Sequence, residues 1–382
     1  MDVECLPALS GIRPRQRGGR RVQRKVHVRP ACPARGERDH TGRARAGDLP
    51  ELLPRTVALG VRRSETRAVT VQLDSALAAD ASVGLWLDPP VLPTKWLYDG
   101  RGSRLFDEIT RLPEYYPTRR ETSILTDRAG EIVAETESVM MVEFGSGTST
   151  KTRLLLDAFS AAGRPFTYVP VDVSAPMLAE SSAILARDYP TIEIRPVEAD
   201  FTQPHLTLPH ADGPRVAVFL GGTIGNFDDD DRGVFFTRVA SALTPGDYFL
   251  LGADLIKDTG RLVAAYNDKA GVTADFNRNM IEVLRTGLGA TGLYTDDFDH
   301  IARWNPVRHR IEMWLRARRP VHATFAALER DWDLAAGTEI LTEISTKFEL
   351  SALHEELASA GLAQVDTWTD PFGDFSLTLS RR

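Results

Sequence analysis

Two glycines and a lysine follow an apolar stretch within residues 142–155, VEFGSGTSTKTRLL, and their spacing is typical of a site for a nucleotide-like ligand. Gly145 and Gly147 can adopt backbone conformations that other residues avoid, so the chain can turn tightly beside a ligand. Lys151 stands at the predicted start of the next helix, where backbone N–H groups favour an anion. A strand, a glycine turn and a helix in this order bind nucleotides at the edge of a parallel sheet.

Thr150 distinguishes among the ligands that such a turn can hold. A P-loop for a nucleoside triphosphate needs G-x-x-x-x-G-K-[ST], and Thr150 stands where its second glycine belongs. A dinucleotide turn needs G-x-G-x-x-G, in which the third glycine lets helix and strand pack closely, and Thr150 occupies this position too. S-adenosylmethionine has no pyrophosphate. It needs only a tight turn that lets its amino-acid end and ribose pass the backbone, and E-F-G-S-G-T can form such a turn. The sequence therefore favours S-adenosylmethionine over both alternatives.

Acidic residues at the ends of three successive predicted strands support the same ligand. Glu143 lies two residues before the turn, Asp172 ends the second predicted strand, and Asp200 ends the third. Asp172 is suited to the ribose hydroxyls and Asp200 to the adenine amino group, with Phe201 beside it to stack on the ring. Each acid alone is equally explained as a helix cap or a solvated turn residue. Together they fit a ligand with a cationic sulfonium better than one with a pyrophosphate.

The surrounding elements alternate between strand and helix, which predicts a doubly wound α/β sheet with helices on both faces. The predicted strands cover residues 138–144, 166–174, 192–201, 215–227 and 248–256, with helices at 149–163, 174–190 and 231–243. A helix over 348–362 and strands over 363–370 and 375–382 complete the pattern. Residues 257–347 interrupt it with helical and alternating stretches. An insertion at this place lies over the carboxyl edge of the sheet, where ligands bind.

The first 68 residues differ from the rest in charge. They hold 16 Lys and Arg against seven Asp and Glu, whereas the remainder holds 30 against 46. We expect a disordered basic extension. The alternatives are a nucleic-acid-binding tail, a targeting peptide, or translation that begins upstream of a true start near Val69 or Val71. The acidic remainder argues against nucleic acid as substrate.

The composition of the chain limits the classes of protein to which it can belong. Both cysteines, Cys5 and Cys32, lie in the basic extension, and the eight histidines show no metal-ligand spacing. No apolar run approaches the roughly 18 residues of a membrane span. We therefore predict a cytoplasmic monomer with no metal, no membrane contact and a small-molecule substrate.

Several segments together resemble one family, the histidine Nα-methyltransferases of ergothioneine biosynthesis, also called dimethylhistidine N-methyltransferases. The resemblance extends from about residue 90 to the end of the chain. Besides VEFGSGTSTKT and YVPVDVS, it is carried by KWLYDGRGSRLFDEITRLPEYYPTRRE (95–121), FLGGTIGNF (219–227), AAYNDKAGVTADFNRN (264–279), HRIEMWL (309–315) and TEISTKF (342–348).

The resemblance implies a Rossmann-like S-adenosylmethionine-dependent methyltransferase fold whose last strand is antiparallel, with a second, smaller α+β substrate domain. Residues 120–256 and 348–382 would form the methyltransferase domain, and residues 69–119 and 257–347 the substrate domain. The residues implied for S-adenosylmethionine are Gly145, Lys151, Asp172, Asp200 and Phe201.

The substrate implied by the resemblance is L-histidine. Asn226 and Tyr266 would hold its amino-acid head, while Glu343 and Ser345 would bind the imidazole. Glu343 and Ser345 are two residues apart, so on a strand they share one face. The residues implied around the ring and the amine are Tyr115, Tyr98, Phe106, the backbone of Gly221, and Met313, for which a place in the core is the alternative.

The implied reaction is trimethylation of the α-amine of histidine to hercynine. The amine must arrive neutral, and positioning with desolvation supplies most of the catalysis, because the sulfonium is already an activated leaving group. No residue is assigned as general base; Asn226 and Tyr98 position the amine. The alternatives are a methyltransferase of the same fold that acts on another small amine, and a protein that binds the cofactor without catalysis.

Overall fold

The computed structural model describes residues 74–201 and 206–382, which belong to one compact unit. The basic extension predicted for residues 1–68, with both cysteines, lies outside the described residues. Among the residues described, no helix is both long and apolar enough to cross a membrane.

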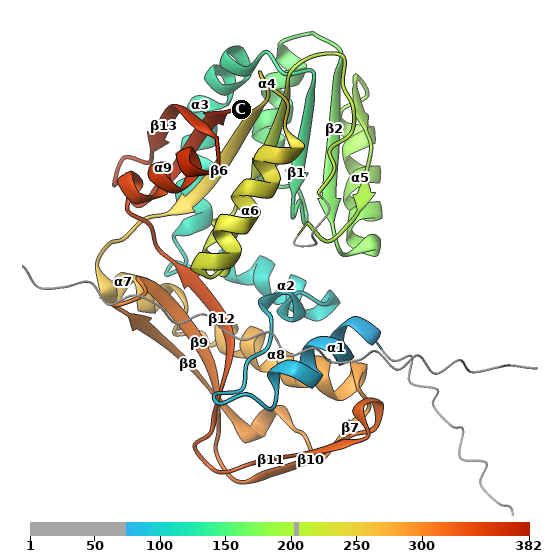
Figure 1. Cartoon of the computed structure of the whole chain (residues 1–382), viewed down its shortest axis with the longest axis vertical. Helices are drawn as coiled ribbons and strands as arrows, with labels where there is room; N and C mark the ends of the chain where they lie inside the picture. The colour runs from blue at the N-terminus through green and yellow to red at the C-terminus, as the bar shows by residue number, and fades with distance from the viewer. Residues whose placement is uncertain (1–73, 202–205) are drawn as a thin grey trace, which may run out of the picture. The chain divides into compact units, whose positions relative to one another are not determined.

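An eight-stranded sheet dominates the unit, and its strand order confirms the predicted fold class (Figure 1). The order is β13-β14-β6-β5-β1-β2-β3, with β4 paired to β2. All pairs are parallel except those of β14, which runs antiparallel to β6 and β13, so the expected antiparallel last strand is confirmed. The strands are β1 (Met140–Phe144), β2 (Phe166–Asp172), β3 (Ile192–Ile194), β4 (Val197–Glu198), β5 (Arg215–Phe219), β6 (Tyr248–Asp254), β13 (Ala363–Thr369) and β14 (Phe375–Arg381).

Helices cover both faces of this sheet, as the continuous apolar strands predict. Apolar side chains of α3 (Pro117–Thr136), α4 (Thr152–Ala161) and α5 (Ala175–Asp188) share one core with the sheet. Those of α6 (Asp229–Ala242) and α9 (Leu350–Ser359) share a second core on the other face (Figure 1). Every residue of β1 is buried, because this strand lies at the centre of the sheet.

Three predicted elements depart clearly from the structure, and the bounds of the others shift by up to three residues. The third strand is split into β3 and β4, with Arg195 and Pro196 between them. Helix α4 begins at Thr152 instead of residue 149, since Ser149 has a φ of 53°, which a right-handed helix excludes. The fourth strand ends at Phe219 instead of residue 227, and a short helical turn, η2 (Thr223–Asn226), follows it.

The residues before α3 and between β6 and α9 form two smaller antiparallel sheets with their own helices. One sheet has the order β12-β9-β8 and the other β11-β10-β7. The strands are β7 (Ala290–Thr291), β8 (Phe298–Asn305), β9 (Arg310–Ala317), β10 (Val321–Phe325), β11 (Arg330–Leu334) and β12 (Glu339–Thr346). The helices are α1 (Ser75–Gly84), α2 (Gly100–Ile109), α7 (Thr259–Ala265) and α8 (Val272–Gly287), with short helical turns at η1 (Thr94–Leu97), η3 (Thr295–Asp297) and η4 (Ala326–Leu328).

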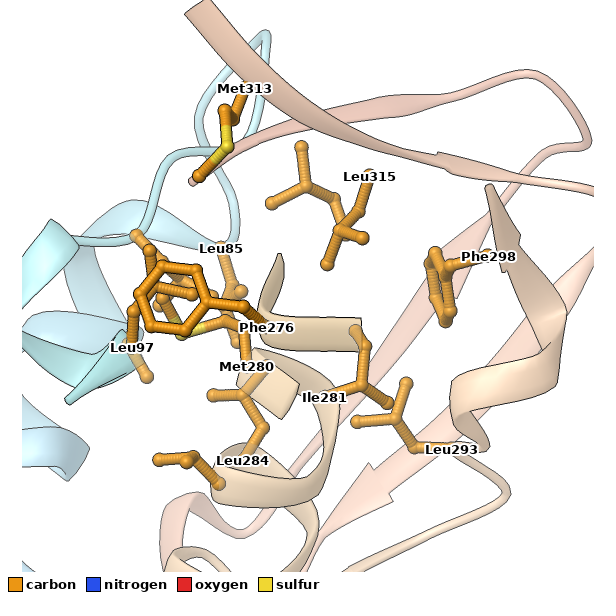
Figure 2. Packing of buried hydrophobic residues seen from close by; sticks show 14 of the residues in the cluster. Leu85, Leu97, Phe276, Met280, Ile281, Leu284, Leu293, Phe298, Met313 and Leu315 are labelled. Atoms are coloured by element: carbon orange, nitrogen blue, oxygen red, sulfur yellow. The ribbon is translucent and has the colours of Figure 1, made fainter. Parts of the chain in front are cut away.

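Helix α8 provides the centre of the core of this second region (Figure 2). Phe276, Met280 and Leu284 recur every four residues, so their side chains lie on one face of the helix. Met313 of β9 belongs to the same buried cluster and is 1% exposed. Its side chain is therefore part of the core. The strand that carries it, β9, is the neighbour of β12 and supports it.

Two of the chain segments that link the large sheet to the smaller ones meet each other. The segment after β6 and the segment after β12 meet in an isolated parallel bridge between Leu255 and Phe348. The Phe348 N–H donates to the carbonyl of Asp254 (2.9 Å), and the Ile256 N–H donates to the carbonyl of Phe348 (3.1 Å). This bridge fixes the end of β12 beside the carboxyl end of β6.

Candidate functional site

The glycine turn after β1 has a left-handed backbone conformation and is held by β2. Gly145 and Gly147 have φ values of 67° and 50°, in the left-handed region that favours glycine. The carbonyl of Val171 accepts from the N–H groups of Gly145 and Ser146. Asp172, at the end of β2, accepts from the N–H of Gly147 (3.0 Å) with one oxygen and from the N–H of Ser174 (3.0 Å) with the other. Asp172 thus positions the turn as well as lying beside it.

Phe201 lies on the other side of the turn. A Cβ added to Gly145 would lie 3.6 Å from the Phe201 ring, so the glycine and the ring are in contact distance. The ring also packs against Phe144 and Phe219. Asp200 precedes Phe201 in the chain and lies two residues after the end of β4. This segment is irregular, whereas we had predicted that Asp200 ends a continuous third strand.

Glu143 lies beneath the turn and is only 3% exposed. Thr152 donates its hydroxyl to this carboxylate at 2.7 Å, and Tyr168 donates its own. Burial raises the pKa of Glu143 to about 7, against these hydrogen bonds and the charge of Lys151, which lower it. Through these two hydrogen bonds Glu143 connects α4 and β2 to the turn.

A pH-dependent stability follows from the raised pKa of Glu143. Its carboxyl ionises more readily in the unfolded chain, near its usual value of 4.5, than in the folded protein, near 7. Stability contributed by the neutral form is therefore present below about pH 4.5 and is lost as the pH rises toward 7. We expect Glu143→Gln to remove this loss, so that the ligand-free variant gains about 3 kcal/mol relative to wild type between low and neutral pH.

Urea unfolding of both proteins near pH 4 and near pH 8 measures this difference. Glu343, whose pKa burial also raises to about 7, contributes equally to both proteins and cancels. Unfolding free energies that change by the same amount with pH in the two proteins would contradict the assignment.

Lys151 has a protein partner that the sequence analysis did not foresee. Its ammonium forms an ion pair with Glu121 of α3, whose side chain is fully buried. Glu121 also accepts from the backbone N–H of Gly221 at 2.8 Å. Glu121 thereby links α3, the N-terminal end of α4 and the loop after β5. Its position one hundred residues from Gly221 leaves no local pattern in the sequence that could have identified it.

The structure brings Asn226 and Glu343 into direct contact. Asn226 lies on η2, beyond the end of β5 where we had placed it, and its Nδ2 donates to Glu343 Oε1 (3.1 Å) and to the carbonyl of Ile344 (2.9 Å). Gly225 allows this approach, because a Cβ there would lie 2.7 Å from the carbonyl oxygen of Thr346. Glu343 is 7% exposed, and burial raises its pKa to about 7 although the hydrogen bond from Asn226 and the charge of Lys347 lower it.

Ser345 and Tyr266 form a second contact beside the first. The two hydroxyls are 2.7 Å apart, and both lie within hydrogen-bond distance of Lys347 Nζ. Ser345 follows Glu343 by two residues on β12, so the two side chains share a face of this strand as predicted. Lys347 was missed by the sequence analysis, although it belongs to the quoted TEISTKF segment.

An aromatic row continues from Tyr266 toward α2. Its rings meet edge to face, Tyr266 with Tyr115 (6.1 Å), Tyr115 with Phe106 (6.1 Å) and Phe106 with Tyr98 (5.3 Å). Burial, with Glu343 as a further cause, raises the pKa of Tyr98, Tyr115 and Tyr266 well above the usual range. These tyrosines are therefore neutral phenols, and the row joins four of the residues that the sequence predicted for one site.

The arrangement fits S-adenosylmethionine at the sheet edge. One carboxylate ends β2 and another lies shortly after β4, an aromatic ring lies beside the glycine turn, and an ammonium lies at the start of α4. Within the described residues no group of three or more His, Cys, Asp or Glu side chains is placed to hold a metal ion. Fold and site together define an S-adenosylmethionine-dependent methyltransferase.

The chain belongs to the histidine-specific, S-adenosylmethionine-dependent methyltransferase family, whose family model matches residues 77–382. It is 51% identical to Histidine N-alpha-methyltransferase of Mycolicibacterium smegmatis and 48% identical to that of Mycobacterium tuberculosis; each alignment covers 80% of this chain and 95% of the relative. It is also 31% identical to Ergothioneine biosynthesis protein 1 of Neurospora crassa, over 74% of this chain and 32% of that protein.

Proposed function

We propose that the protein transfers three methyl groups in turn to the α-amine of L-histidine, which yields hercynine in the first step of ergothioneine biosynthesis. The observation that supports this most directly is the pairing of Glu343 with Asn226 beside the Ser345–Tyr266 pair. A carboxylate acceptor and a hydroxyl on one strand face match the two nitrogens of an imidazole, one a donor and one an acceptor. The family membership agrees with this substrate.

The methyl donor in this proposal is S-adenosylmethionine, held by Gly145, Lys151, Asp172, Asp200 and Phe201. When bound, it supplies a methyl group on a positively charged sulfur, which is already activated for displacement. Asp172 receives the ribose and Phe201 one face of the adenine. Lys151, at the start of α4, exchanges part of its contact with Glu121 for the carboxylate of the donor.

The histidine amine is oriented by Asn226 in this proposal. Both protons of Asn226 Nδ2 are engaged by Glu343 and by the carbonyl of Ile344, so the amide oxygen is the atom suited to the amine. Tyr266 takes the substrate carboxylate, while Glu343 and Ser345 take the ring. Binding then fixes the direction of the amine lone pair, and positioning of this kind accounts for a large share of catalysis in displacement reactions.

The aromatic row accounts for repeated methylation. Each product is still an amine until three methyl groups are present, and every added methyl makes the head more apolar. Tyr98 and Phe106 offer ring edges and faces that tolerate a methylated ammonium through cation–π contact. In this proposal residues 69–119 and 257–347 act as the substrate domain, residues 120–256 and 348–382 act as the methyltransferase domain, and the protein works as a monomer.

Mass spectrometry tests the proposed function. The purified protein is incubated with S-adenosylmethionine and each of the 20 amino acids in turn, and products are followed over time. Histidine alone should gain one, two and three methyl groups. Methylation of a different amino acid or small amine, with histidine unchanged, would instead establish the alternative of a related methyltransferase with another acceptor.

A further inference from the structure

Lys347 is a buried cation that the proposed function leaves without a role. Its side chain is 1% exposed, and it is placed where β12 leaves the smaller sheet. Its Nζ lies 2.7 Å from Ser345 Oγ, 2.9 Å from Tyr266 Oη and 2.9 Å from Asp254 Oδ2. A buried lysine is costly unless it is paired and fully hydrogen-bonded, and these three partners satisfy it.

The hydrogen bonds of Lys347 determine which way the neighbouring hydroxyl protons point. An ammonium has three protons and no acceptor, so its three partners must all accept. Ser345 and Tyr266 therefore both accept from Lys347, and one of them donates to the other across their 2.7 Å contact. Their two hydroxyls carry two protons, of which this contact uses one. In this contact one hydroxyl proton of the pair is left to donate. When Tyr266 turns its own proton to the substrate carboxylate, as in the proposed function, the proton of Ser345 remains to donate to the ring.

We propose that Lys347 is a positioning residue that turns the Ser345–Tyr266 pair into a hydrogen-bond donor, and that this makes the site select a ring with an acceptor nitrogen. The inference deepens the proposed function and rests on it. Glu343, on the same strand face, supplies the complementary acceptor, since it receives a hydrogen bond from Asn226 and carries no donor when ionised. A neutral imidazole presents one donor and one acceptor, and so matches both groups.

Lys257 provides a matched control within the same network. It also pairs with Asp254 and donates to Tyr116 Oη at 2.9 Å, but no bond joins it to Ser345 or Tyr266 in the described residues. Asp254 keeps one lysine partner in either single variant. A change specific to Lys347 therefore reports on the hydroxyl pair and not on the neutralisation of Asp254.

The experiment compares Lys347→Met and Lys257→Met with wild type. For each protein, kcat and KM are measured with histidine and with β-(pyrrolyl)alanine, which keeps the ring N–H and lacks the acceptor nitrogen. Wild type should prefer histidine by about 10²-fold or more in kcat/KM, as sites that donate to a substrate nitrogen do. Lys347→Met should reduce this preference at least about tenfold, mainly through KM for histidine, whereas Lys257→Met should stay within about threefold of wild type.

Circular dichroism shows whether the variants fold, and Lys347→Gln replaces Lys347→Met where the methionine variant does not. The glutamine amide can donate to only part of the pair, so an intermediate preference is expected. Two results would overturn this inference and leave the proposed function standing. One is a folded Lys347 variant that prefers histidine as strongly as wild type does. The other is a Lys257→Met variant that loses as much of the preference as Lys347→Met. A wild-type protein that does not methylate histidine would overturn the proposed function and this inference together.

Discussion

Glu343→Ala is expected to lower kcat/KM for histidine by about 10²- to 10⁴-fold, as the loss of a buried polar partner for a substrate group does. Glu343 is the acidic group on the face of β12 that contacts Asn226, and its removal leaves the ring N–H of histidine without an acceptor. It also frees one proton of Asn226 Nδ2, so the amide that we propose to orient the amine loses one of its two fixed contacts. Steady-state kinetics with histidine, at saturating S-adenosylmethionine, measure the effect.

Two further variants make this result specific. Glu343→Gln keeps an acceptor oxygen but not the charge, so it should retain more activity than the alanine variant. Glu339→Ala removes the other acid of β12, which pairs with Arg303 and Arg316, and should change kcat/KM by less than about threefold. Unchanged histidine turnover in Glu343→Ala would mean that the carboxylate does not bind the substrate ring, and would favour the alternative acceptor.

The fold could be predicted closely because its signals are local. Continuous apolar strands such as β1, with helices between them, specify a doubly wound sheet without knowledge of distant contacts. The errors occurred where backbone chemistry overrides a pattern of apolar residues. The left-handed backbone of Ser149, for example, delays the start of α4.

The site was only partly accessible from the sequence. Its residues came from the resemblance, and the structure adds which of them touch, such as Asn226 with Glu343 and Tyr266 with Ser345. The supporting groups Glu121 and Lys347 were missed, because a buried charge is recognised by its partners and those partners lie on other elements. Periodicity and propensity describe a residue's neighbours along the chain, whereas these ion pairs join residues of different elements.

Asp172→Ala is expected to weaken binding of S-adenosylmethionine by about 100-fold or more, because the substitution removes two functions at once. The carboxylate holds the glycine turn through the N–H groups of Gly147 and Ser174, each at 3.0 Å. Hydrogen bonds to a charged acceptor contribute roughly 1.5–3 kcal/mol each, and two donors are left unpaired in the variant. The proposed contact with the ribose hydroxyls is lost as well. Calorimetric titration of the donor, or of its demethylated product, gives the dissociation constant directly.

Two controls separate ligand binding from the order of the turn. Asp172→Asn keeps one acceptor oxygen, so it should bind the donor more tightly than the alanine variant and less tightly than wild type. Asp188→Ala, which removes a part-exposed acid of α5 paired with Arg153, should leave the dissociation constant within about twofold. Wild-type affinity in Asp172→Ala would show that neither the ribose nor the turn depends on this carboxylate. Because the proposal places Asp172 at the cofactor side and Glu343 at the substrate side, the two alanine variants should also differ in which ligand they lose: Glu343→Ala should keep the affinity for S-adenosylmethionine, and Asp172→Ala should not.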